Sequence, residues 1–170
     1  PPPWRSTTAA VPTPGWRTTY DTDTPAKMLL RMASYGRRML RAGITTVRDL
    51  GSPTDLGIEL RESIDAGLTE GPRLLVAGSP ITTTGGHCWV MGGECDGELG
   101  IRRQVREHVK AGTDWIKVMA TGGNMTPRTN TFAAQFTVDE LRACIEEAHR
   151  LRRRVAAHAH GIAGIRVAAE

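Results

Sequence analysis

A lysine in the middle of an apolar segment is the residue of greatest chemical interest. Lys117 lies in the run DWIKVMATGG, where strand alternation places it on the same face as Trp115 and Met119. An ammonium group among apolar side chains is costly unless it is paired or chemically altered. Two interpretations stand side by side: Lys117 is altered or acts as a ligand, or it reaches solvent or a carboxylate such as that of Asp49.

Two histidines follow in VAAHAHG, at the carboxyl end of another apolar segment. The i, i+2 spacing of His158 and His160 puts both side chains on one face of a strand. Paired imidazoles at such a position can bind a divalent ion or move a proton. The alternative is a pair of core or loop histidines whose ring nitrogens are satisfied by backbone groups.

Two glycine-rich loops carry further polar residues. His87 lies between two glycine pairs in TTTGGHCWVMGGECDG and is the only side chain of that loop that titrates near neutral pH. A merely flexible loop would explain these glycines as well. In TGGNMTP, Asn124 follows Gly122 and Gly123, whose amides could cradle a phosphate, although the GK[ST] of a Walker motif is missing.

The elements that must position these residues form four helix-then-strand units. Apolar residues at helical spacing predict helices over 26–43, 55–67, 100–112 and 137–151, the last opened by a Thr137 and Glu140 capping box. Apolar runs predict strands over 44–50, 73–78, 115–120 and 155–161. This alternation is typical of an α/β fold with a parallel sheet, which keeps its chemistry in the loops after the strands.

Composition narrows the class of protein. Residues 1–24 are rich in Pro and Thr without apolar periodicity, so we expect a disordered leader, followed by one domain over 25–170. A net charge of +4 without clustering argues against a nucleic-acid partner. No apolar run is long enough for a membrane span and no secretory signal is present, so we expect a cytoplasmic protein. Three cysteines without a CxxC spacing argue against disulfides and against a thiolate metal site.

Six sequence motifs, taken in order along the chain, together resemble the amidohydrolase superfamily, in the branch that includes Xaa-Pro dipeptidases and imidazolonepropionase-like proteins. These motifs are RAGITTVRDLG, GPRLLVAG, TTTGGHCWVMGGECDG, DWIKVMATGGNMTP, FTVDELRACIEEAHRL and VAAHAHG. The resemblance runs from about residue 26 to the C-terminus. It implies a (β/α)8 TIM barrel that hydrolyses a carbon–nitrogen bond, in an amide or a dipeptide, with the help of divalent metal ions.

The resemblance also implies roles for single residues. It makes Lys117 a carboxylated lysine, a carbamate that bridges two divalent ions, usually zinc. It makes His158 a ligand of the second metal, with His160, His87 and Asn124 as substrate contacts or supports of the ligands. The reverse assignment of His158 and His160 stays open. The substrate would be a small molecule or a dipeptide, and oligomerisation is open.

The chain departs from the family in what it lacks. Members carry an HxH pair on strand one, a histidine on strand six and a proton-accepting aspartate on strand eight, whereas this chain has no histidine before His87. A full barrel needs about 250 residues, so we expect 170 residues to supply a partial barrel, about strands two to five with their helices. No catalytic residue is assigned. We expect a metal-dependent amidohydrolase chain that is incomplete and inactive alone. The alternatives are a non-catalytic barrel fragment that serves as a binding or remnant module, and a phosphate-binding barrel enzyme.

Overall fold

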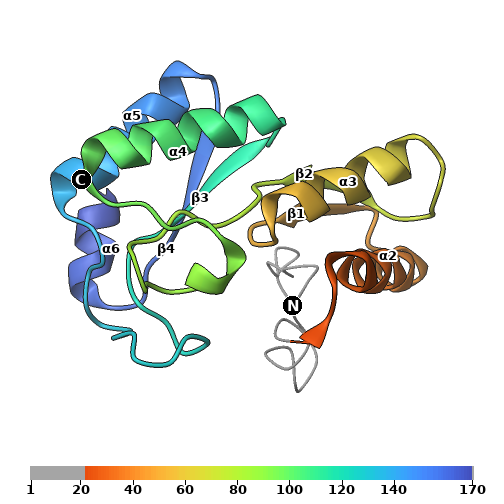
Figure 1. The fold of residues 1–170 in the computed structure, drawn as a ribbon, viewed down its shortest axis with the longest axis horizontal. Coiled ribbons are helices and arrows are strands. Elements are labelled where there is room, and N and C mark those ends of the chain that lie inside the picture. The colour runs from red at the N-terminus through yellow and green to blue at the C-terminus, as the bar shows by residue number, and fades with distance from the viewer. Residues whose placement is uncertain (1–21, 170) are drawn as a thin grey trace.

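Helices and strands alternate along residues 22–169, the part of the chain described by a computed structural model (Figure 1). The elements are α2 (Pro25–Arg41), β1 (Thr46–Asp49), α3 (Thr54–Asp65), β2 (Arg73–Val76), the short 3-10 helix η1 (Trp89–Met91), α4 (Gly97–Ala111), β3 (Trp115–Met119), α5 (Val138–Arg150), β4 (Arg154–His158) and α6 (Ile162–Ala169). The predicted α/β class and the order of its elements are confirmed. Residues 1–21 of the expected leader lie outside the described residues.

The strands pair in parallel, as the helix-then-strand pattern predicted. β1 pairs with β2 and β3 pairs with β4, each in parallel. An isolated parallel bridge between Ile81 and Val118 ties the segment after β2 to β3. The carboxyl ends of β3 and β4 therefore lie side by side, and the loops that follow them leave from the same edge.

The helix ends follow from local hydrogen bonding. Thr24 caps α2 and its hydroxyl accepts from the Lys27 amide, with Pro25 in the first turn where no amide is needed. The predicted capping box of α5 is confirmed: the Thr137 hydroxyl accepts from the Glu140 amide, and the Glu140 carboxylate accepts from the Thr137 amide. These caps fix where each helix begins and hence how its apolar face meets the strands.

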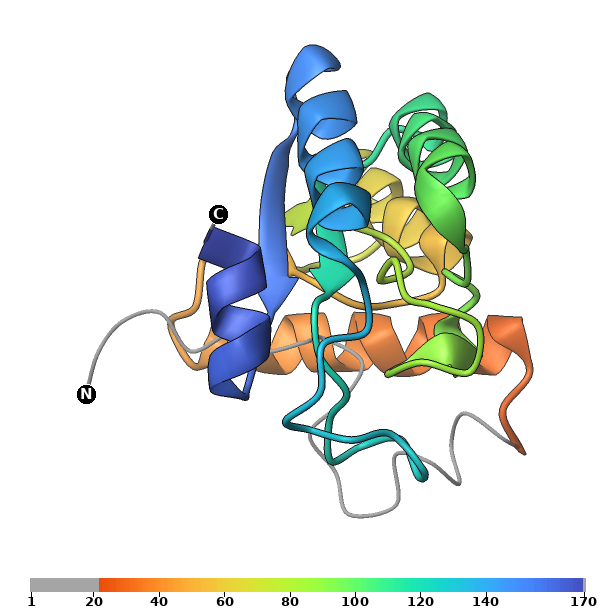
Figure 2. The same ribbon diagram turned by 90° about the vertical axis from the view of Figure 1, so that its left-hand side faces the viewer.

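The core of residues 22–169 has three clusters, and the two larger ones follow the two strand pairs. One cluster joins α4 and α5 to β3, and the other joins α2 and α3 to β1 and β2. In Figure 1, α4 and α5 lie next to each other over β3, and α2 lies next to α3 beside β1 and β2. Figure 2 shows α5 and α6 beside β4. The candidate functional residues come from the first of these two halves.

The two strands that carry them differ in burial. Four of the five residues of β3 are buried, whereas every residue of β4 is at least partly exposed. β3 is therefore largely covered on both faces, whereas β4 is not. Within residues 22–169, β4 has a strand partner on one side only, which leaves its other edge open. None of the helices in this part of the chain is long and apolar enough to cross a membrane.

Candidate metal site at the carboxyl ends of β3 and β4

Lys117 is buried in β3, as its sequence context predicted. Only 9% of the residue is exposed, and no ion pair of its ammonium group is present among residues 22–169, so the alternative in which Asp49 neutralises it is wrong. Burial lowers the pKa of Lys117 to about 8; the Cys88 thiol raises it and the Arg48 guanidinium lowers it further. With a pKa of about 8, roughly one amine in ten is uncharged at pH 7, and this fraction rises with pH.

His158 is the last residue of β4 and faces the same way as Lys117. The strands pair Lys117 with Ala156 and Met119 with His158, so the lysine and the histidine are two positions apart on neighbouring strands. The ring atom Nε2 lies 3.3 Å from the carbonyl oxygen of Gly122. Burial lowers the pKa of His158 to about 4, and nearby Lys117, His87 and His160 lower it further. The imidazole is therefore neutral at physiological pH, which is the form that binds metal ions.

His87 reaches the same place from the loop between β2 and α4. Its ring centroid lies 4.8 Å from that of His158. The ring atom Nδ1 lies 3.1 Å from the Thr126 hydroxyl, and the backbone amide donates to the side-chain oxygen of Gln135 at 2.7 Å. A Cβ atom on Gly123 would lie 2.4 Å from Nε2 of His87. The glycine following β3 thus allows the ring to pack against the backbone, because a Cβ atom at Gly123 would collide with it.

His160 does not lie where the strand pattern put it. The ladder ends at the pair of Met119 and His158, so the expectation that both histidines share a strand face is wrong for His160. Its residue is exposed, its backbone amide donates to the Thr121 hydroxyl at 3.1 Å, and its ring meets that of His158 edge-on with centroids 4.6 Å apart. Of the two histidines, His158 therefore has the position of a ligand and His160 that of its neighbour.

The glycine loop after β3 uses its polar groups internally. Asn124 is exposed and its side-chain oxygen accepts from the Thr131 hydroxyl at 3.2 Å. The amide of Gly122 donates to the carbonyl of Ala133, and that of Gly123 to the Thr129 hydroxyl. Two of the amides expected to cradle a phosphate are thus already engaged, which counts against the phosphate-binding hypothesis.

Gln135 holds the two loops together, a role that the sequence did not indicate. Its side-chain oxygen accepts from the His87 amide, and its side-chain nitrogen donates to the Thr82 hydroxyl and to the Met119 carbonyl, both at 3.0 Å. One side chain therefore links the His87 loop to the end of β3. A glutamine in a polar loop has no sequence signature that would have revealed this.

The residues present fit part of a metal site. A neutral imidazole and a partly neutral buried amine are suitable donors, and the amine becomes an oxygen donor if it is carboxylated. Within the described residues, no group of three or more His, Cys, Asp or Glu side chains is placed to hold a metal ion. Lys117 and His158 are thus two candidate ligands, and residues 22–169 offer no complete ligand set around them.

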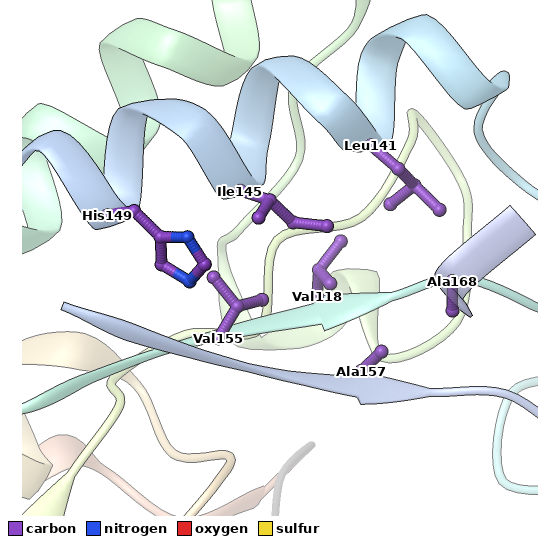
Figure 3. A pocket seen from close by; sticks show the side chains of 7 residues that line it. All are labelled: Val118, Leu141, Ile145, His149, Val155, Ala157 and Ala168. Atoms are coloured by element: carbon purple, nitrogen blue, oxygen red, sulfur yellow. The ribbon is translucent and has the colours of Figure 1, made fainter. Parts of the chain in front are cut away.

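An apolar cavity of about 200 Å³ lies on the opposite face of the same strands (Figure 3). Val118, Val155 and Ala157 line it from the strands, and Ile145 and His149 line it from α5. These strand residues alternate with Lys117 and His158, so their side chains point away from the histidines. The cavity is consequently separate from the candidate metal site.

Comparison with known proteins identifies the family. The sequence model described as the amidohydrolase family matches residues 6–170. The chain belongs to the amidohydrolase family. Its solved structural neighbours include amidohydrolases of the TIM-barrel type, so its α/β elements are those of such a barrel.

Individual relatives match this chain over part of their own length. It is 34% identical over 169 residues to ochratoxinase of Aspergillus niger, covering 85% of this chain and 35% of that protein. The crystal structure of that ochratoxinase superposes with a TM-score of 0.80 at 32% identity, covering 95% of this chain and 42% of the other. A Xaa-Pro dipeptidase crystallised with methionine in its active site superposes with a TM-score of 0.81 at 30% identity, covering 84% and 39%. The chain therefore spans about a third of the sequence relative's length.

Proposed function

We propose that the chain supplies the lysine and one histidine ligand of a metal-dependent amidohydrolase that hydrolyses a carbon–nitrogen bond in a small amide or dipeptide. Family membership and the names of the relatives, an ochratoxinase and a Xaa-Pro dipeptidase, support hydrolysis of such bonds in general. The observation that carries the proposal is a buried amine, Lys117, which has no ion pair within residues 22–169 and lies beside a neutral imidazole, His158.

Lys117 would act after reaction with carbon dioxide. The neutral amine forms an N–C bond to carbon dioxide and loses one proton to water, which leaves a carbamate anion. A pKa of about 8 makes the neutral amine available near physiological pH. Carboxylation turns a buried cation, which is costly, into an anion with two oxygen donors. The carbamate would still carry a charge within β3, and the divalent ions would balance that charge when bound.

His158 would bind the ion through a ring nitrogen, and the neighbouring imidazoles would support it. His87 and His160 flank its ring, and the loop that carries Asn124 borders the same edge, so these three residues are candidates for contact with substrate. Two divalent ions, for which zinc is the first candidate, would polarise the amide carbonyl and acidify the attacking water when bound. No residue among 22–169 is proposed as the proton acceptor.

Metal content tests this proposal directly. The purified chain would be loaded with zinc and analysed beside Lys117→Ala, His158→Ala and the control His149→Ala, whose side chain faces the apolar cavity instead. We expect the first two variants to lose zinc and the control to retain it. Equal zinc content in the wild type and in both site variants would remove the assignment of Lys117 and His158.

A second candidate function is a non-catalytic barrel fragment that serves as a binding module. It is favoured by the lack of three metal-binding side chains in one place within residues 22–169. The two functions differ in one assay: hydrolysis of a Xaa-Pro dipeptide by the zinc-loaded chain. Turnover that disappears in Lys117→Ala supports the enzyme, whereas zinc binding without turnover supports the module.

A further inference from the structure

Four sulfur-containing side chains gather beside the candidate metal site. Cys88, Met91 and Met119 are buried in mutual contact at 4%, 4% and 5% exposure, and the partly buried Met125 packs against them. They come from the His87 loop, from β3 and from the loop after β3. Among the apolar side chains of residues 22–169, no others belong to this cluster. We refer to these four residues as the sulfur cluster.

The sulfur cluster differs in its surroundings from the other methionines of the chain. Met28 and Met32 pack among aliphatic residues of α3, β1 and β2, where flexible methionines fill space. The sulfur cluster instead lies against polar groups: the Cys88 backbone amide donates to the Thr126 hydroxyl at 2.8 Å, and Lys117 is near enough to act on the Cys88 thiol electrostatically. It therefore combines one ionisable sulfur with three thioethers at a place that Met125 leaves partly open.

The chemistry of these donors selects a particular class of metal ion. Thiolate and thioether sulfur are soft ligands, which favour Cu(I) over hard cations such as Mg²⁺ and Ca²⁺. We propose that Cys88, Met91, Met119 and Met125 form a binding site for a soft monovalent metal ion, with Cu(I) as the first candidate. The site is distinct in its ligands from the Lys117 and His158 site and does not depend on the proposed hydrolase function.

Binding involves no change in oxidation state. The Cys88 sulfur forms a bond to Cu(I) and its S–H bond breaks, with the proton passing to solvent. Burial raises the pKa of this thiol to about 11, so in the absence of metal it is protonated at neutral pH.

The test is competition for Cu(I) against the chromophoric chelator bathocuproine disulfonate, carried out anaerobically on the full chain. We expect one Cu(I) per chain in the wild type. Cys88→Ser and the volume-conserving Met119→Leu and Met125→Leu should each weaken Cu(I) binding by at least about tenfold. Loss of a group that only supports a metal ligand already weakens metal binding by about that factor. Circular dichroism would show that each variant is folded. Met125→Leu is the safest substitution in this respect, because its side chain is only partly buried.

Matched controls distinguish this site from other sulfur-containing residues and from the proposed hydrolase site. Cys144→Ser and Met32→Leu change buried sulfur residues in other clusters, so binding should be unaffected. Lys117→Ala and His158→Ala should lose zinc but keep a Cu(I) ion, which makes failure of this proposal distinguishable from failure of the hydrolase proposal. Cu(I) affinity unchanged by Cys88→Ser and Met125→Leu in folded protein would overturn the inference, as would equal losses in the Cys144→Ser control.

Discussion

Replacing Gly123 by alanine tests how the His87 loop is held against the end of β3. The added Cβ would lie 2.4, 2.5 and 2.7 Å from Nε2, Cε1 and Cδ2 of His87. Ordinary van der Waals contact begins near 3.4 Å, so the ring must retreat by about 1 Å. The His87 ring is buried and hydrogen-bonded to the Thr126 hydroxyl, so it cannot move without disturbing its neighbours.

Overpacking of this kind costs about 1–3 kcal/mol. For a chain of this size, such a loss lowers the thermal midpoint by roughly 2–12 °C. The assay is thermal unfolding followed by circular dichroism, with Gly100→Ala as the matched control. Gly100 lies within helix α4, and a Cβ atom added to it would meet only the Cys95 side chain, at 3.9 Å. Alanine at this position should therefore be neutral or stabilising.

Two results would refute the reasoning about Gly123. An unchanged midpoint in Gly123→Ala would mean that His87 does not pack against that glycine. An equal loss in Gly100→Ala would mean that the effect is not specific to the ring contact. A proton spectrum of the histidine rings adds a second readout, because movement of His87 away from His158 should shift the signals of both.

Three further outcomes follow from the structure. Hydrogen bonds from Arg150 and Arg106 lower the pKa of the buried Glu147 to about 2. The contribution of Glu147 to the free energy of unfolding is therefore complete above its ordinary pKa of 4.5 and is lost as the pH falls towards 2. Urea unfolding of Glu147→Gln should show a weaker pH dependence in that window than the wild type, and identical curves would contradict this prediction. Thr137→Ala should lower the free energy of unfolding by about 1 kcal/mol, because the cap of α5 is lost; no change in the urea midpoint would count against the cap. Cys144 is buried with its pKa raised to about 12, so in native protein it should react with a thiol reagent far more slowly than in urea, and equal rates would show that α5 is not packed as described.

The sequence predicted those parts of the fold that depend on local patterns. The capping box at Thr137 and Glu140 and the apolar period of α5 are properties of neighbouring residues, so they could be read directly. The burial of Lys117 was likewise predictable, because apolar residues surround it within its own strand. The parallel pairing followed from the alternation of helices and strands.

The errors concern features set by residues far away in the chain. The strand that carries His158 stops there because its ladder partner, β3, ends at Met119, and no property of VAAHAHG reveals that limit. The hydrogen bond between Asn124 and Thr131 is a feature that the sequence did not predict, because it depends on how the loop folds back on itself. The sulfur cluster around Cys88 forms only where three separate segments meet, so no single segment of the sequence could predict it.

The measurement closest to the central claim is carbon NMR of the zinc-loaded chain in ¹³C-labelled bicarbonate. If Lys117 is carboxylated, the wild type and the control Lys110→Ala, in which an exposed lysine of α4 is removed, should show one carbamate signal that is absent from Lys117→Ala. No carbamate signal in the wild type, or a signal that persists in Lys117→Ala, would contradict the assignment of this amine as a metal ligand.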